Sequence, residues 1–333
     1  MATGTTTSSQ VGAPVQEFYD RVLLDRAIDV LVHDKFGQKR PIKPNSGEQP
    51  KFRRFSSLTN KTQPLVETVT PSPDQLSKTD KTGQLQQFGN YVELSDYVQY
   101  TTEDPILAET ATLLGENAGE SLDLVYRDTL AAGTSVFYAN DVAGRSSIVT
   151  AQSTADYKKI ERALMNNNAK MFRDKPIVGS DKVGTSPVWN AFFAIIDSYA
   201  YYDLRSLSGF LQRSEYPDGG ASAMDNEIGS LGHIRFVVCN NAKVWASSGG
   251  SVGSTGYKST DSSNIDVHTA LIFGKNAYGI TPLEGKAMEN IIKPLGSGND
   301  PLNQRSTSGW KATTDCLILN ENFMYRYEFA VTE

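Results

Sequence analysis

The sequence predicts an α+β protein whose body carries long extended segments. Residues 37–100 contain six prolines, which exclude a long helix there. Residues 103–132 carry the pattern of one long helix, and strand-sized apolar runs such as 236–239 follow in the second half of the chain. Of the 333 residues, 39% are hydrophobic and 21% are charged, so the composition allows a packed core.

The first 36 residues divide into two parts. Residues 1–12 are rich in threonine, serine and glycine, and they lack the basic and apolar regions of a signal peptide, so we expect synthesis in the cytosol. Over 13–36, apolar residues recur at helical spacing and predict a peripheral helix that ends near Gly37 and packs on something outside itself. These apolar residues are Val15, Phe18, Val22, Leu24, Ile28 and Leu31.

Residues 37–100 are too long for an ordinary loop, and we expect an extended excursion in the form of a long hairpin. Short strands are predicted over 51–58 and 65–69. Between residues 35 and 61, eight basic residues stand against one acid, a local net charge of +7. The whole chain has a net charge of −6, so the rest carries −13. An acidic balance argues against a protein that binds nucleic acid by neutralising phosphates.

The long helix over 103–132 has clear start and stop signals. Asp104 is a good N-cap with Pro105 at the first helical position, and Gly133 is a good C-terminal stop. Gly115 and Gly119 interrupt it, and each costs about 1 kcal/mol relative to alanine in mid-helix. We therefore expect both glycines to permit the close approach of another backbone.

The remaining elements are shorter and alternate between helix and strand. Helices are predicted over 154–172 and 198–207. A strand and turn are predicted over 134–144, and strands over 188–196, 234–239, 270–273, 316–319 and 323–331.

No metal-binding or catalytic spacing is found. His33, His233 and His268 show no metal-ligand spacing, and neither a nucleophile elbow nor a zinc-protease motif occurs. Cys239 and Cys316 lie far apart inside apolar runs, so we expect buried free thiols. No apolar stretch approaches the roughly 18 residues that a membrane helix needs. We predict no metal, no cofactor and no membrane partner.

The glycine- and serine-rich span over 247–264 is predicted to be a mobile surface loop. It fails as a phosphate loop, because Tyr257 separates Gly256 from Lys258 and no buried strand leads into it. An enzyme whose site assembles in space around this loop is one alternative, and it predicts a small soluble oligomer. The favoured prediction is a protein without catalytic residues that is not an enzyme.

Several ordered motifs resemble the N-four-like family of phage major capsid proteins, over roughly residues 50–330. Their number and order carry the resemblance rather than any one of them. The matching segments are 91–98 (Tyr-Val-Glu-Leu-Ser-Asp-Tyr-Val), 102–105, 119–134, 202–205, 227–229, 234–236, 300–305 (Asp-Pro-Leu-Asn-Gln-Arg), 309–311 and 318–322.

The resemblance implies the Hong Kong 97-type capsid fold, with an N-terminal arm, an extended loop, a peripheral domain with a long spine helix, and an axial domain. It implies these boundaries: arm 1–36, extended loop 37–100, peripheral domain 101–186 with spine helix 103–132, axial domain 187–300, and C-terminal strands 301–333 that return to the peripheral domain. The lysine–asparagine crosslink of the founding phage has no alignable residues here, so we predict none.

The resemblance also implies a function. We expect a major capsid protein that assembles with itself into hexamers and pentamers of an icosahedral shell around double-stranded phage DNA. Scaffold and portal proteins are expected partners, a decoration protein is a further one, and packaged DNA is contacted only non-specifically. The protein would be made in the host bacterial cytoplasm and reside in the virion capsid. An encapsulin-like compartment shell is the alternative.

The basic segment is the candidate inter-subunit contact. We hypothesise that Lys51, Arg53 and Arg54 meet acids on an adjacent subunit, with Phe52 and Phe55 adding apolar contact. A single exposed ion pair contributes only about 0–1 kcal/mol, but repeated contacts in a closed lattice add up. The alternative is a basic hairpin that is simply solvated.

Overall fold

The computed structural model describes most of the chain from residue 31 onward. The described residues are 31–56, 58, 60–62, 64, 70, 72–101, 106–172, 190–216, 223–224, 226–253, 256–295 and 302–333. Within this part of the chain, every helix is too short or too polar to span a bilayer.

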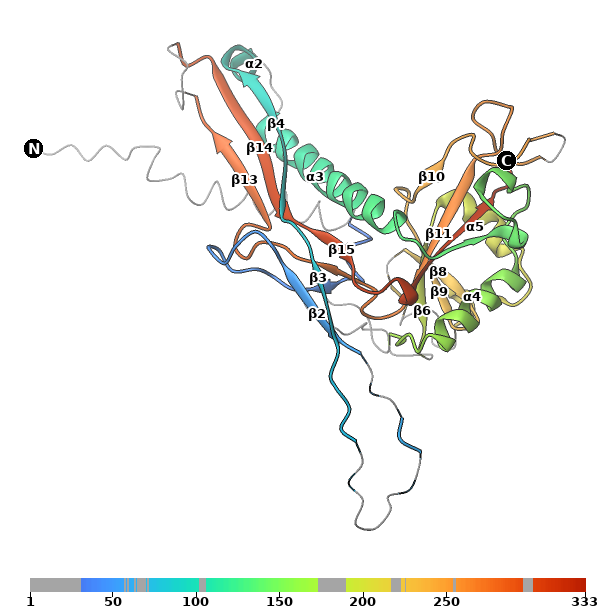
Figure 1. Ribbon diagram of the computed structural model, residues 1–333. Helices are drawn as coiled ribbons and strands as arrows, with labels where there is room; N and C mark the ends of the chain where they lie inside the picture. Colours follow the sequence, from blue (N-terminus) through green and yellow to red (C-terminus); the bar gives the residue numbers. More distant parts are fainter. Residues whose placement is uncertain are drawn as a thin grey trace, which may run out of the picture.

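An eight-stranded mixed sheet is the centre of the body, at the right of Figure 1. Its order is β5 (Val136–Tyr138), β16 (Met324–Ala330), β11 (Val267–Phe273), β6 (Phe192–Ile196), β9 (Ile234–Val238), β8 (Glu227–Leu231) and β7 (Phe210–Gln212), with β10 (Val244–Trp245) paired to β11. Strands β6 and β11 are buried along their whole length, as expected for apolar runs at the middle of a covered sheet.

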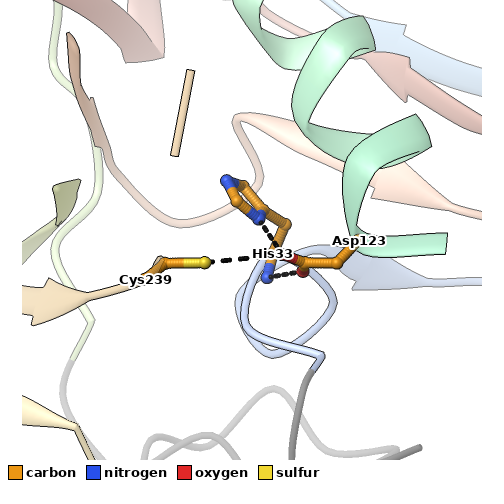
Figure 2. Close-up of side chains that lie close together, drawn as sticks. All are labelled: His33, Asp123 and Cys239. Atoms are coloured by element: carbon orange, nitrogen blue, oxygen red, sulfur yellow. Dashed lines mark hydrogen bonds and ion pairs between the residues drawn. The ribbon is translucent and has the colours of Figure 1, made fainter. Parts of the chain in front are cut away.

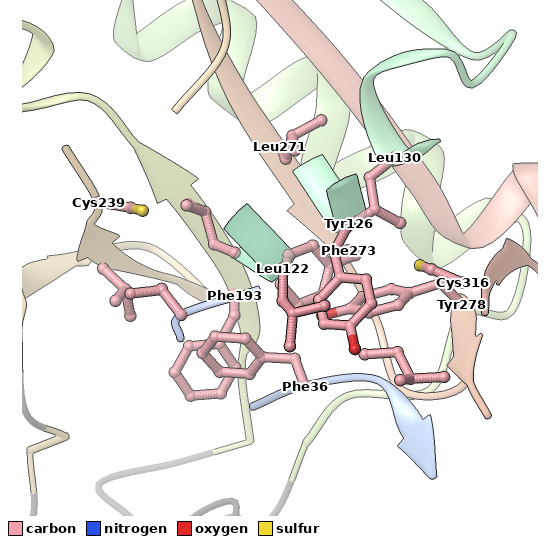
Figure 3. Close-up of a cluster of buried hydrophobic side chains, with 14 of the residues drawn as sticks. Phe36, Leu122, Tyr126, Leu130, Phe193, Cys239, Leu271, Phe273, Tyr278 and Cys316 are labelled. Carbon is pink, nitrogen blue, oxygen red and sulfur yellow. The ribbon is translucent and has the colours of Figure 1, made fainter. Parts of the chain in front are cut away.

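The two faces of this sheet pack into two separate cores. Helices α4 (Thr154–Asn166) and α5 (Ser198–Arg205) cover one face, where Phe192, Ala194 and Ile196 point. The alternate residues Phe193 and Ile195 point to the other face and meet the long helix and the segment around residue 36. Figure 3 shows this second core, in which the rings of Phe36 and Phe193 have centroids 4.7 Å apart. Because alternate side chains of β6 point to opposite faces of the sheet, this one strand contributes to both cores.

The long helix α3 (Ile106–Ala131) leaves the body and runs along a second sheet (Figure 1). Its 26 residues correspond to roughly 39 Å at 1.5 Å per residue. The second sheet has the order β13 (Met288–Lys293), β14 (Arg305–Thr314) and β4 (Gln86–Ser95). The indole of Trp310 on β14 donates to Asn117 of α3 at 3.1 Å, and Tyr126 hydrogen-bonds to Thr314 at 2.9 Å. These bonds hold the helix against one face of the sheet.

The smaller elements connect these parts. A three-stranded sheet joins β1 (Gln38–Lys39), β12 (Tyr278–Ile280) and β15 (Cys316–Ile318), and a two-stranded ribbon pairs β2 (Lys51–Phe55) with β3 (Lys78–Thr82). Helix α2 (Asp96–Thr101) follows β4. Short 3-10 turns cover Ala139–Asp141, Arg145–Ser147, Arg213–Glu215 and Glu321–Phe323.

The helix predicted over 13–36 is wrong at its end, and its residues 13–30 lie outside the described residues. Residues 31 and 32 have no regular structure instead, and a turn at 33–34 leads into a bend at 35–37. The backbone N–H groups of Val32 and His33 both donate to the carboxylate of Asp123, at 3.0 and 2.9 Å, so a tertiary contact replaces the helical hydrogen bonds. Helical periodicity alone could not anticipate a distant acceptor.

The helix predicted over 154–172 is also too long. It ends at Asn166, because Asn167 caps it and Asn168 adopts a left-handed backbone with φ of 55°. The predicted long helix is confirmed as α3, although residues 102–105, with the predicted N-cap, lie outside the described residues. The strand predicted over 65–69 also lies outside them, whereas the one at 51–58 is confirmed as β2.

The glycine- and serine-rich span is attached to the body more closely than a mobile loop would be. The Gly250 N–H donates to the Ile148 carbonyl at 2.9 Å, and the Gly249 N–H donates to the Ile265 carbonyl at 2.9 Å. Tyr257 forms a bridge with Thr332 next to the C-terminus. These backbone bonds explain why so glycine-rich a stretch follows a defined path.

Candidate functional site

The β2–β3 ribbon, which we call the hairpin arm (residues 51–82), projects away from the body in Figure 1. Every residue of both strands is exposed except Phe52. An isolated two-stranded hairpin is marginally stable in water at best. The arm is therefore a candidate for contact with something outside its own chain.

Phe52 fastens the base of the hairpin arm to its own subunit. Its side chain is only 7% exposed, and its ring lies over Gly279 on β12. A Cβ added at Gly279 would lie 2.7 Å from the ring, so glycine is needed for this approach. The guanidinium of Arg40 stands 5.9 Å from the ring centroid on top of it. The structure thus uses Phe52 inside the subunit.

The charges of the hairpin arm are partly paired within it. Arg53 forms a bidentate pair with Asp80 on the opposite strand, at 2.9 and 3.2 Å, and holds the pKa of that carboxyl below its ordinary value. Lys61 pairs with Asp74 at 2.9 Å. Across 51–82 six basic residues stand against three acids, a net charge of +3. The net charge counted over residues 35–61 is larger than that of the hairpin arm, because the acids of the arm lie after residue 61.

The other predicted contact residues differ in their exposure and in their contacts within the chain. Lys51 is exposed, and the Phe55 side chain is 59% exposed without being part of either core. Arg54 stacks on the ring of Phe323 in its own chain, 5.5 Å from the centroid. The hairpin arm therefore presents an aromatic ring beside basic groups.

Gly115 and Gly119 are both buried in α3. The helix packs against β14, β15 and β4. Which backbone approaches the two glycines stays a prediction.

A buried polar cluster fixes the point where the chain enters the body. Figure 2 shows His33, Asp123 and Cys239 together, although they come from the first described segment, from α3 and from the end of β9. His33 donates from Nδ1 to Asp123 Oδ2 at 2.9 Å, and the Cys239 thiol donates to the same oxygen at 3.4 Å. The other oxygen, Oδ1, accepts the N–H groups of Val32 and His33. All four acceptor positions of the carboxylate are filled.

This cluster acts as an anchor, and its chemistry favours hydrogen bonds over a metal. Three ligand types meet within 4.8 Å, which is compact enough for an ion. However, hydrogen bonds already fill the acceptor positions of Asp123, and burial together with the charge of Asp123 raises the pKa of the Cys239 thiol to about 12, so the thiol is protonated and acts as a donor. Sequence patterns did not predict the cluster, because His33 and Cys239 lie 90 and 116 residues from Asp123. Tyr278 completes it by donating to the His33 carbonyl at 2.6 Å.

A second histidine pair resembles part of a catalytic triad without forming one. His268 Nδ1 lies 2.8 Å from Asp197 Oδ2, and both residues are buried. The neighbouring Ser198 hydroxyl donates to Asp197 at 3.5 Å, not to the histidine. His268 Nε2 has no partner among the described residues. A serine nucleophile needs its base in contact, so this arrangement does not activate Ser198.

Comparison with solved structures finds phage capsids across nearly the whole chain. The capsid of Ralstonia phage GP4 matches with a TM-score of 0.68 at 12% identity, covering 89% of this chain and 87% of that one. The capsid of cyanophage P-SCSP1u matches with a TM-score of 0.59 at 14% identity, covering 91% and 89%. The head structure of Helicobacter pylori bacteriophage KHP40 gives 0.58 at 15% identity, covering 88% and 87%. No curated protein matches the chain.

The mixed helix-and-sheet fold of this chain is thus similar to that of phage capsid structures. A family model described as phage capsid protein matches residues 78–315, which is 238 of the 333 residues. The chain belongs to this phage capsid protein family. It is a major capsid protein that acts in the virion by assembling with copies of itself, and an encapsulin-like compartment is not favoured.

Proposed function

We propose that this chain is the subunit of an icosahedral shell, built from hexamers and pentamers, that encloses double-stranded phage DNA. The observation that carries the proposal is the hairpin arm, a ribbon exposed on both faces and fastened to its own subunit at its base. Such a ribbon becomes stable when a neighbouring subunit covers it. The motif series at 91–98 and 300–305 supports the N-four-like branch of the family.

We propose the following division of the chain: N-terminal arm 1–36, extended loop 37–100, peripheral domain 101–186, axial domain 187–300 and C-terminal strands 301–333. The run of α3 along a separate sheet supports a peripheral domain with a spine helix. Two pairings bear on the boundaries. Strand β13 pairs with β14 in the sheet along α3, so residues 288–293 are an exception to the proposed axial domain. Strand β16 pairs with β11, so the last strand of the chain lies in the large sheet and not in the sheet along α3.

We propose that Lys51, Arg53, Arg54 and Phe55 of one subunit contact acids and apolar groups of the next. The arm's net charge of +3 and the 59% exposure of Phe55 support this. Each exposed pair contributes about 0–1 kcal/mol, so the effect depends on repetition around the shell. Phe52 acts differently, by holding the arm to its own subunit.

The test is charge reversal of the arm. Arg53→Glu with Arg54→Glu should lower the yield of shells seen by electron microscopy and leave the unfolding curve of the free subunit within about 0.5 kcal/mol of the original. Lys158→Glu with Arg162→Glu, on the exposed side of α4, makes the same charge change elsewhere and should assemble normally. Equal yields from both double variants would contradict the proposal.

A charge swap separates the two roles of Arg53. Arg53→Asp with Asp80→Arg keeps the pair within the arm and its net charge but moves the guanidinium to the other strand. If this variant assembles normally, Arg53 serves the hairpin itself and the inter-subunit contact belongs to Lys51, Arg54 and Phe55. Discrete small oligomers of the unaltered chain, in place of shells or capsomers, would refute the shell proposal as a whole.

Scaffold and portal proteins, and a decoration protein, are further proposed partners, with packaged DNA held only non-specifically. The chain's net charge of −6 supports a weak hold on DNA. We also propose synthesis in the host bacterial cytoplasm. Co-purification of a second protein with immature shells would test the scaffold.

A further inference from the structure

Helix α3 connects the two larger sheets of the molecule (Figure 1). The bond between Asn117 and Trp310 holds it to the second sheet, and Leu122 and Leu130 lie in the core shared with residues of β6 and β11. The direction in which α3 leaves the large sheet therefore sets how the two sheets are oriented relative to each other. Because the helix is roughly 39 Å long, a rotation of about 5° at the large sheet would move its far end by about 3 Å.

The C-terminal end of α3 is fastened by a side chain of the large sheet. A helix leaves the carbonyl groups of its last four residues without partners inside the helix. Here the carbonyls of residues 128–130 accept from backbone N–H groups of the turn that follows, at 3.1 to 3.3 Å. The carbonyl of Ala131 instead accepts from Nη1 of Arg326 on β16, and the same nitrogen donates to the Gly133 carbonyl at 3.1 Å. A cation at this position also complements the negative end of the helix dipole.

The guanidinium of Arg326 is itself held by groups of the body. Its Nε donates to the Glu328 carboxylate at 2.7 Å, and its central carbon lies 5.3 Å from the centroid of the Trp245 ring. Glu328 is fully buried and accepts two more bonds from Arg145, at 2.7 and 2.8 Å, while Arg145 stacks on the same indole at 3.7 Å. The Arg326 side chain is only 11% exposed. These contacts fix the place of the Nη1 that holds the helix end.

Further bonds tie the turn after α3 to the same part of the body. The Thr134 N–H donates to Glu321 Oε2 at 3.0 Å, and the Ser135 hydroxyl donates to the Glu321 carbonyl at 2.9 Å. The backbone N–H of Arg326 donates to the Ser135 carbonyl at 2.9 Å. The backbone of the turn is thus bound to β16 and to the 3-10 turn before it, whereas Arg326 reaches with its side chain to the last residue of the helix.

We propose that Arg326 is a positioning residue that sets the direction of α3 relative to the large sheet and, through it, the curvature of the shell. This proposal rests on the shell assembly proposed above. A closed particle of defined size requires every copy to present its contact surfaces at the same angles. Copies whose α3 points in different directions would present the second sheet at different angles and would close into particles of different sizes.

Arg326→Lys in the full chain tests the proposal. Lysine keeps the positive charge, but one ammonium group cannot replace a planar fork that bonds Glu328 on one edge and the helix carbonyls on the other. Arg145→Lys is the matched control, because it also removes a fork from Glu328 and does not touch the end of α3.

Electron microscopy of the assembled particles gives the distribution of their diameters. We expect this distribution to be about twofold broader for Arg326→Lys than for the unaltered chain, and to be unchanged for Arg145→Lys. Both variants should lower the urea midpoint of the free subunit, because both weaken the bonding of the buried Glu328. A purely stabilising role of Arg326 would therefore change the midpoint without changing the diameters.

Hydrogen exchange of the free subunit gives a second measurement, which does not need assembly. The N–H groups of Ala132 and Gly133 close the last turn of α3. They should exchange about threefold faster in Arg326→Lys and at the original rate in Arg145→Lys, because only the first change releases this end of the helix. Equal rates in the two variants would contradict the role of Arg326.

The outcomes separate this inference from the shell proposal. Unaltered diameters with Arg326→Lys, or equal broadening with Arg145→Lys, would overturn the inference and leave the shell intact. If Arg326→Lys does not fold, Gly133→Ala takes its place. Its added methyl group would lie 3.1 Å from Met324 Cε and 3.2 Å from Glu321 Oε2, which displaces the same turn without changing Arg326. Unaltered diameters with Gly133→Ala would likewise overturn the inference. Failure of the unaltered chain to form shells would instead sink the proposed function.

Discussion

Replacement of Asp123 by alanine should be among the most damaging single changes in the body. The carboxylate is fully buried and accepts bonds from Val32, from His33 twice and from Cys239. Its removal leaves at least three buried N–H donors without an acceptor, and each costs about 1–3 kcal/mol before the structure relaxes. Because relaxation recovers part of this, we expect a loss of about 3–5 kcal/mol in the free energy of unfolding.

The assay is urea unfolding of the free subunit, followed by tryptophan fluorescence. Asp128→Ala is the matched control, since Asp128 lies on the same helix but is 53% exposed in its pairs with Arg127 and Lys243. That control should cost at most about 1 kcal/mol. Protease should also release the first 30 residues faster from Asp123→Ala. If Asp123→Ala lowered the free energy of unfolding by less than about 1 kcal/mol, or by no more than Asp128→Ala does, Asp123 would not be the anchor of this segment.

The anchor also has a defined pH dependence. Burial alone would raise the pKa of Asp123, but the hydrogen bonds from His33 and Val32 hold that pKa below its ordinary value. An unfolded aspartate has a pKa of about 3.9, so the stabilisation is complete above about pH 4 and is lost as the pH falls through the lower folded value. The difference in the free energy of unfolding between the unaltered chain and Asp123→Ala should therefore become smaller only below about pH 4. If this difference already became smaller between pH 7 and pH 5, the stabilisation would not come from the ionised Asp123 carboxylate.

Three further changes test other parts of the fold. Gly279→Ala places a methyl group 2.7 Å from the Phe52 ring and should detach the base of the hairpin arm, seen as faster hydrogen exchange in β2 with an unchanged body. Glu227→Gln should cost about 3–5 kcal/mol by urea unfolding, because it weakens the buried bidentate pair with Arg235 at 2.6 and 2.7 Å. Gly119→Ala should destabilise α3 if a backbone packs there, whereas a gain of about 1 kcal/mol in the same assay would show open space.

The sequence was enough to predict those elements whose ends or apolar runs are marked by neighbouring residues. Gly133 marks the end of α3 within two residues, and the apolar run at 270–273 is part of β11. The strands of the second sheet were not predicted. Strand β14 buries Ser306 and Ser308 together with Trp310, so its inward face lacks the apolar alternation on which a strand prediction depends. Its partner β4 lies more than 200 residues earlier in the chain.

The candidate site was predicted only in part for a similar reason. The basic composition around Arg53 and Arg54 is visible in the sequence, but the pairing of Arg53 with Asp80 depends on the hairpin register. The burial of Phe52 depends on Gly279, which is far away in the chain. Composition therefore indicated a basic segment as the candidate contact, and tertiary structure decides which of its side chains remain available for one.

The exposed hairpin arm has a consequence for accuracy in building a large closed particle. In the proposed assembly, the arm's side chains would form weak, salt-sensitive contacts one at a time, so a subunit that joined in a wrong orientation would satisfy few of them and dissociate quickly. A correctly seated subunit would gain all of them together and stay much longer. Weak individual contacts would thus give the growing particle a means of error correction, which a single strong contact per subunit would remove.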